Sequence, residues 1–163
     1  MAPEWPQMAL REAGKALKDV DLSKTYPRSP RAKLAGLVML ARTTDKARAS
    51  NAGTPGEYHF GCGMDRHVLG FLGSEPAEFA KAVAELRTDD RVASWTQARL
   101  SGKSAADVDR FNADFAEDGP TPGSDSEEFH HGERERLGRP DITTWFDLLD
   151  LDEGREVPRR VAA

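Results

Sequence analysis

Residues 29–53, SPRAKLAGLVMLARTTDKARASNAG, form the stretch that decides the fold. Ser29 is a favoured N-cap residue and Pro30 fits the first helical position, so the sequence predicts a helix that begins here and continues to Gly53. Residues spaced four, three, four and three apart share one face of this helix: Leu34, Val38, Ala41, Asp45 and Arg48. The apolar face therefore runs directly into charged side chains.

Further amphipathic helices are predicted on both sides of this stretch, because apolar residues recur there at three- and four-residue spacing. The expected ranges are about 7–20, 65–73, 75–86, 89–100, 104–118, 128–137 and 141–152. Asp65 and Asp141 are the expected caps of two of them, and Ser104 with Asp107 resembles a capping box. Four glycines and a proline over residues 53–63 favour a loop or a short hairpin.

These patterns indicate a mainly α fold, a compact single domain of six or seven helices with at most a short hairpin near residues 54–62. We expect residues 1–20 to form an N-terminal amphipathic helix and residues 21–155 to form the helical domain. The last helix is expected to fray from Glu153, and residues 156–163 to be a flexible tail. Residues 118–128, rich in Gly, Pro, Ser and acidic residues, are expected to form a mobile loop.

The composition argues against a disulfide-stabilised, a membrane-inserted and a nucleic-acid-binding protein. Cys62 is the only cysteine, so no internal disulfide can form and a reducing compartment is expected. No long apolar segment indicates export or membrane insertion, and we expect a cytoplasmic protein with no membrane contact. The net charge of −5 combines about +5 in residues 1–50 with about −10 in the remainder, and this acidic remainder argues against nucleic-acid binding.

Asp45 is flanked at helical spacing by Arg42 and Arg48, three residues away on either side, and Lys46 lies four residues after Arg42. Two interpretations remain open. The charges form a structural ion-pair cluster that ties the helix to the glycine-rich segment, or the surplus cations bind an anionic ligand, for which arginine offers a fork that matches carboxylate or phosphate.

The segment EYHFGCGMDRH, residues 57–67, carries the other candidate groups. Cys62 precedes a predicted helix and is either a nucleophilic or redox thiol or a small buried residue that Asp65 keeps protonated. Tyr58 is an acid, base or hydroxyl donor if a neighbouring cation lowers its pKa, and otherwise an aromatic anchor. His59, Cys62, Asp65 and His67 carry suitable ligand atoms, but their spacing matches no established motif, so no metal site is predicted.

Several short motifs occur in a characteristic order. They are Pro27-Arg28-Ser29-Pro30-Arg31, Asp45-Lys46-Ala47-Arg48-Ala49, Gly56-Glu57-Tyr58, Cys62 before Asp65, Phe71-Leu72-Gly73 and Thr144-Trp145-Phe146. On these motifs the sequence resembles a bacterial family known only as a domain of unknown function, over about residues 21–155. The resemblance implies no activity, substrate or catalytic residue.

The leading hypothesis is a small-molecule site, either a binding site or an enzyme's active site, between the long helix and the glycine-rich segment. Its expected ligand is a small anionic molecule, and no cofactor is expected. The predicted catalytic residues are Asp45, Tyr58 and Cys62, and the predicted ligand-binding residues are Arg42, Lys46, Arg48 and His59. The alternative is a non-catalytic protein-interaction or homo-oligomeric module, with a homodimer as its simplest form.

Overall fold

The computed structural model describes residues 20–160 and contains seven α-helices and no strand within that range. The helices are α2 (Leu40–Ala52), α3 (Gly63–Phe71), α4 (Pro76–Leu86), α5 (Asp89–Arg99), α6 (Ala105–Ala116), α7 (Asp125–Leu137) and α8 (Trp145–Asp152). The mainly α prediction is confirmed. The predicted N-terminal helix falls on residues 1–20 and so lies, except for its last residue, outside the described residues.

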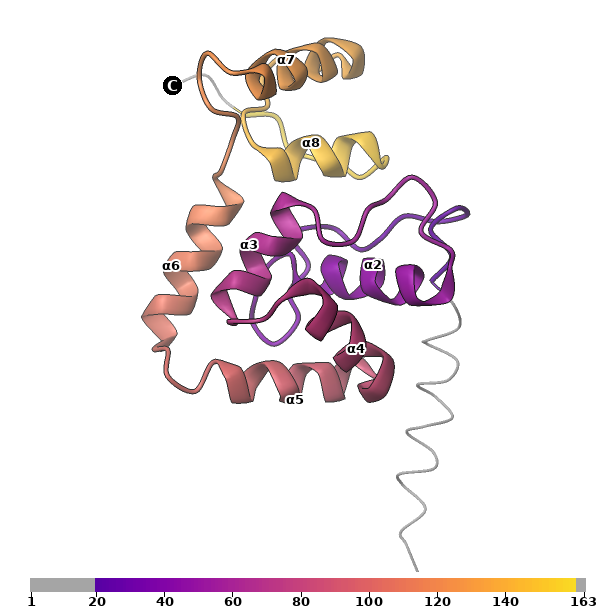
Figure 1. The fold of residues 1–163 in the computed structure, drawn as a ribbon. Helices are drawn as coiled ribbons and strands as arrows, with labels where there is room; N and C mark the ends of the chain where they lie inside the picture. The colour runs from indigo at the N-terminus through magenta and orange to yellow at the C-terminus, as the bar shows by residue number, and fades with distance from the viewer. Residues whose placement is uncertain (1–19, 161–163) are drawn as a thin grey trace, which may run out of the picture.

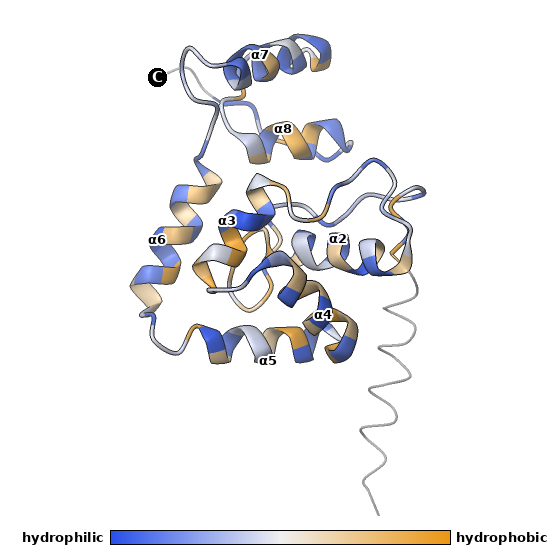
Figure 2. Cartoon of the chain, in the orientation of Figure 1, coloured by the Kyte–Doolittle hydropathy of each residue, from blue (hydrophilic) through white to orange (hydrophobic). Residues whose placement is uncertain are grey.

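The helices pack around α2, which contacts α3 and α4, while α4 contacts α5 (Figure 1). Helix α6 leads from this group towards α7 and α8, which pack on each other. Hydrophobic and hydrophilic residues alternate around most of the helices, as expected for helices with one face in the core (Figure 2). Within residues 20–160, no helix combines the length and the apolar character needed to cross a membrane.

The central helix begins at Leu40, so the predicted start at Ser29 and Pro30 is wrong. Before it, the chain makes a tight reversal in which Leu34 and Leu37 exchange two backbone hydrogen bonds of 3.1 and 3.0 Å. Ala35 and Gly36 at the tip have positive φ values of 53° and 79°, which a helix does not allow.

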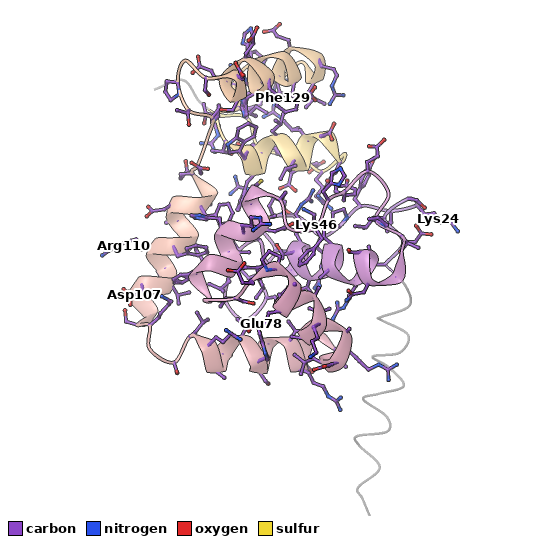
Figure 3. All side chains as sticks on the ribbon, viewed as in Figure 1. Lys24, Lys46, Glu78, Asp107, Arg110 and Phe129 are labelled. Carbon is purple, nitrogen blue, oxygen red and sulfur yellow. The ribbon has the colours of Figure 1, made fainter. Side chains whose placement is uncertain are left out.

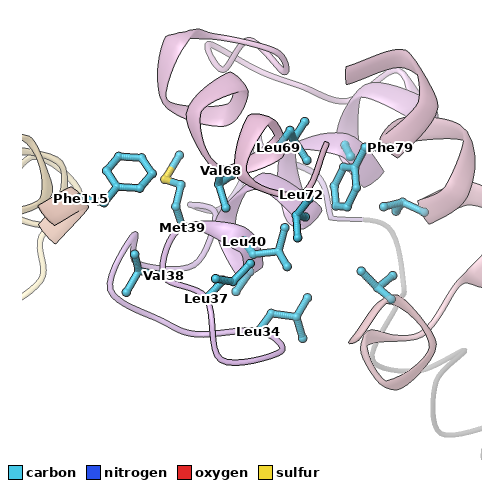
Figure 4. Packing of buried hydrophobic residues seen from close by; sticks show 14 of the residues in the cluster. Leu34, Leu37, Val38, Met39, Leu40, Val68, Leu69, Leu72, Phe79 and Phe115 are labelled. Carbon is cyan, nitrogen blue, oxygen red and sulfur yellow. The ribbon is translucent and has the colours of Figure 1, made fainter. Parts of the chain in front are cut away.

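The reversal replaces a helical start because of the apolar run that it carries. Its apolar side chains are all buried, namely Leu34, Leu37, Val38, Met39 and Leu40. A helix would point some of five such closely spaced residues towards solvent. The reversal turns all of them into the core, where they meet Val68, Leu69, Leu72, Phe79 and Phe115 (Figure 4).

Several predicted helix ends are confirmed and others are corrected. Ser104 and Asp107 form a capping box in both directions. Asp65 does not cap α3, because Cys62 occupies the N-cap position and Asp65 lies one turn inside. Asp141 does not cap α8 either: the Thr144 hydroxyl accepts the backbone N–H of Asp147.

No hairpin forms over residues 54–62, because this loop pairs with the segment that precedes the reversal. The backbone N–H of Leu22 donates to the Thr54 carbonyl at 2.9 Å. Gly56 has a φ of 57°, and a side chain there would collide with the Leu22 carbonyl. Glycine is therefore required in the Gly56-Glu57-Tyr58 motif, since only glycine combines positive φ with this close approach.

The side chain of Asn112 on α6 holds the reversal in place through two hydrogen bonds, so its removal should destabilise the fold. Its side chain accepts the Val38 N–H at 3.0 Å and donates to the Gly36 carbonyl at 2.8 Å. Replacement by Ala leaves buried polar backbone groups unpaired, so Asn112→Ala should lower the free energy of unfolding by about 1–3 kcal/mol. Chemical denaturation measures this. The matched control is Asn51→Ala, whose exposed bond to the Ala80 carbonyl should cost about 0.5 kcal/mol or less.

Candidate functional site

The predicted cations lie on α2, and each one meets a carboxylate from a distant part of the chain. Arg42 forms a two-pronged pair with Glu153, with Nη1–Oε1 at 2.8 Å and Nη2–Oε2 at 2.6 Å. Both side chains are buried, with 2% of Arg42 and 5% of Glu153 exposed. The predicted fraying from Glu153 is therefore wrong, because this residue anchors the end of α8 to the first turn of α2.

Lys46 lies one turn further along the same helix and is buried as well. Its Nζ is 2.7 Å from Oδ2 of Asp65 and 3.3 Å from Sγ of Cys62. Asp65 is fully buried and also accepts hydrogen bonds from the Thr43 hydroxyl and the Gly61 backbone N–H. Helices α2 and α3 thus hold the Lys46 ammonium (labelled in Figure 3) beside the thiol of Cys62, which itself donates to Oδ2 of Asp65 at 3.5 Å.

Asp45 and Arg48 belong to a third group at the other side of α2. The Arg28 guanidinium donates to both oxygens of Asp45 at 3.0 Å and to Asp89 at 2.8 Å. Arg48 donates to Asp89 at 2.8 Å and lies 3.9 Å from Asp45. The two aspartates hold both arginines between them, so Asp45 acts here as an ion-pair partner.

The surplus of positive charge that the sequence indicated is cancelled by these partners. Five cations, Arg28, Arg42, Lys46, Arg48 and Arg155, face five carboxylates, Asp45, Asp65, Asp89, Asp150 and Glu153. Sequence reasoning assigned no role to Arg28, Asp89, Asp150, Glu153 or Arg155, since their spacing to α2 is too long for any local pattern. One signal was present, because Arg28 lies in the Pro27–Arg31 motif.

Tyr58 lies beside the first of these pairs. Its hydroxyl donates to Oε2 of Glu153 at 2.8 Å, and the Arg42 guanidinium lies 5.5 Å from the ring centroid. Burial raises the pKa of Tyr58, and the hydrogen bond to the Glu153 carboxylate raises it further, which outweighs the pull of Arg42. The expected lowering of this pKa does not occur, and the phenol remains a proton donor near neutral pH.

The structure brings some of the remaining candidate residues together and separates others. Cys62 is partly exposed at the N-cap of α3, next to Lys46. His59 is exposed in the loop. His67 stacks on Phe111, with ring centroids 5.3 Å apart, and so faces away from the thiol. Across the described part of the chain, no three His, Cys, Asp or Glu side chains converge as metal ligands do.

Comparison with known proteins adds the family. A family model described as a domain of unknown function, DUF5069, matches residues 24–155. The chain belongs to the DUF5069 family. All ten charged residues of the network lie inside the DUF5069 match, so the ion pairs are contained in the domain itself. No curated protein matches the chain.

Removing the Glu153 charge should destabilise the DUF5069 domain. Glu153→Gln keeps the shape of the side chain but leaves Arg42 without its counter-charge, and breaking a buried pair in this way costs about 3–5 kcal/mol. Denaturant unfolding at neutral pH measures the loss. Glu85→Gln, on the exposed surface of α4, is the control and should unfold like the unchanged protein.

The same carboxylates predict how stability depends on pH. Burial raises the pKa of Glu153, but bonds from Arg42, Tyr58 and Arg155 outweigh it and hold this pKa below the model-compound value of 4.5. A lowered pKa contributes stability that is complete above about pH 4.5 and disappears as the pH falls through the folded-state pKa. Stability should therefore fall as the pH decreases below about 5, and less steeply in Glu153→Gln. Equal slopes in the two proteins would contradict the assigned pairing.

Proposed function

We propose that this DUF5069 domain holds a small-molecule site centred on the thiol of Cys62. One observation carries the proposal: a buried ammonium, that of Lys46, is fixed 3.3 Å from a partly exposed sulfur. Thiolate is the nucleophilic form of cysteine, and here it would gain an ammonium hydrogen bond. It would also lie at the N-terminus of α3, where the helix dipole favours negative charge.

The surroundings of Lys46 support a functional role for this charge. Burying a lysine and an aspartate costs desolvation energy, and such a pair seldom stabilises a fold more than apolar residues of the same volume. The carboxylate of Asp65 is oriented by two further donors, Thr43 and Gly61. This arrangement fixes the ammonium within reach of the sulfur, which positioning of a reactive group requires.

The balance of charge guides the choice of ligand. The guanidinium groups of Arg42 and Arg48 are already paired with carboxylates of the protein. They therefore have fewer N–H groups available for an anionic ligand than the sequence indicated. We therefore assign them, together with Asp45, to positioning the wall of the site. The proposed reaction is addition of the Cys62 thiolate to the activated carbon–carbon double bond of a small uncharged electrophile, with the Lys46 ammonium beside the sulfur. The S–C bond forms as the π bond breaks, and the carbon that gains the electron pair takes up a proton from water.

Alkylation kinetics test this proposal directly, because Cys62 is the only cysteine and every modification reports on it. Lys46→Met removes the ammonium, and the rate of reaction with iodoacetamide at pH 7.5 should fall about tenfold, equivalent to about 1.4 kcal/mol of lost stabilisation. Mass spectrometry of quenched samples measures the rate. Lys81→Met, on exposed α4, is the control and should react at the unchanged rate.

Two control measurements distinguish loss of the Lys46 charge from loss of folding. Circular dichroism must show that Lys46→Met is folded, and Lys46→Arg, which keeps the charge, should restore most of the rate. The proposal fails if Cys62 in the folded protein reacts no faster in the presence of Lys46 than in its absence.

A second candidate function is a non-catalytic interaction module, including a homodimer, and Phe129 favours it. This aromatic residue on α7 is 61% exposed, where large apolar side chains are usually covered (Figure 3). If α7 forms an interface between copies, light scattering should show a mass that rises with concentration, and Phe129→Ser should keep the protein monomeric. A monomer at every concentration rejects the homodimer.

A further inference from the structure

A cavity of about 390 Å³ lies beside Arg31 of the Pro27–Arg31 motif and does not include Cys62. Its walls also come from Glu117 after α6, from Asp147 and Asp150 of α8, and from residues 156–160. Residues 156–160 belong to the segment expected to be a flexible tail, and here they form a wall. The cavity has the size of a typical small-molecule site.

One part of the cavity is built to receive a carboxylate. Asp147 is buried and divides its two oxygens between two guanidinium groups, with Arg31 at 2.7 Å and Arg160 at 2.8 Å. Burial raises the pKa of Asp147, but the hydrogen bonds from Arg160 and Arg31 outweigh burial and lower it, so the carboxylate is charged. Two cations share one buried anion, which leaves guanidinium N–H groups for a second anion.

The position of Arg31 is fixed independently of Asp147. Its guanidinium lies 5.7 Å from the centroid of the Phe146 ring, within the range of a cation–π contact. This contact restricts where the Arg31 guanidinium can lie, and a guanidinium held in place offers a planar fork to a carboxylate. Asp150 is the other acidic residue of α8 in the cavity wall, and it accepts hydrogen bonds from Ser29 and Arg155. Asp150 therefore does not compete with a ligand for Arg31.

The mouth of the cavity carries the opposite charge. Glu117, at the end of α6, is 67% exposed at its side chain, and its one ion pair, with Arg160, is long at 3.6 Å. Glu156 is also exposed and lines the same cavity. Two weakly held carboxylates therefore face the same space as the guanidinium groups. They would repel a simple anion and attract a positive group on a ligand whose negative end reaches Arg31 and Arg160.

We propose that this cavity binds a small zwitterion of about dipeptide size, with a carboxylate at one end and an ammonium at the other. The carboxylate bridges Arg31 and Arg160, and the ammonium lies between Glu117 and Glu156. A ligand with only one of these charges meets repulsion from the other end of the cavity. This site and its ligand do not depend on the thiol of Cys62.

Three probes of nearly equal size separate the two charges: L-alanyl-L-alanine, its N-acetyl derivative and its C-terminal amide. Isothermal titration calorimetry should show binding of the free dipeptide, with both derivatives at least about tenfold weaker. Glu156→Gln should reduce the preference for the free dipeptide over the N-acetyl form, because the ammonium loses a partner. Arg110→Gln, on the exposed face of α6, is the control and should leave all three affinities unchanged.

Arg31→Gln should abolish the preference for the free dipeptide over the amide, and Glu156→Gln still tests the site if this variant fails to fold. Equal affinity for all three probes, or no binding of any of them, overturns the proposal. Cys62→Ser should bind the dipeptide normally. An equal rate of Cys62 alkylation in the unchanged protein and in Lys46→Met, together with intact dipeptide binding, would therefore count against the proposed function alone.

Discussion

The buried pair between Arg42 and Glu153 is the constraint on which the rest of the structure depends. It joins the first turn of α2 to the end of α8, 111 residues apart in the sequence. A buried charge without its partner costs several kcal/mol, so neither side chain can be buried before the other arrives. The pair therefore couples the packing of α8 to that of α2, and Tyr58 and Arg155 complete it by bonding to the same carboxylate.

The Pro27–Arg31 motif joins several helices through hydrogen bonds and ion pairs with acidic residues. Three of its side chains bind four aspartates: Arg28 binds Asp45 and Asp89, Ser29 binds Asp150, and Arg31 binds Asp147. Pro27 lies in an extended stretch, and Pro30 lies in a turn in which the Ala32 N–H donates to the Ser29 carbonyl at 3.0 Å, so the three side chains leave the backbone in different directions. The motif thus links α2, α5 and α8 through ion pairs. Its Arg31 also lines the cavity proposed to bind the zwitterion.

Because the five cations are paired with five carboxylates, the cations of α2 carry no surplus charge for an anionic ligand. The proposed chemistry is therefore placed at Cys62. Charge pairs that satisfy each other are a means of specifying one arrangement of helices, since a wrong packing leaves charges unpaired. Lys46 differs from the other cations because its second contact is a sulfur rather than an oxygen. The Arg31 and Arg160 pair differs in another way, since both share a single buried carboxylate.

The sequence by itself determined the helical class, most helix ranges from α4 to α7 and the capping box at Ser104, because these follow from local spacing and local hydrogen bonds. It also placed Arg42, Lys46, Tyr58 and Cys62 in one region, since they lie close along the chain. Only the tertiary structure decided that α2 starts at Leu40, because burying a continuous apolar run is a demand of the whole core. It alone assigned Glu153, Asp89 and Asp147 as partners, since electrostatic pairing depends on distance in space, which sequence separation does not encode.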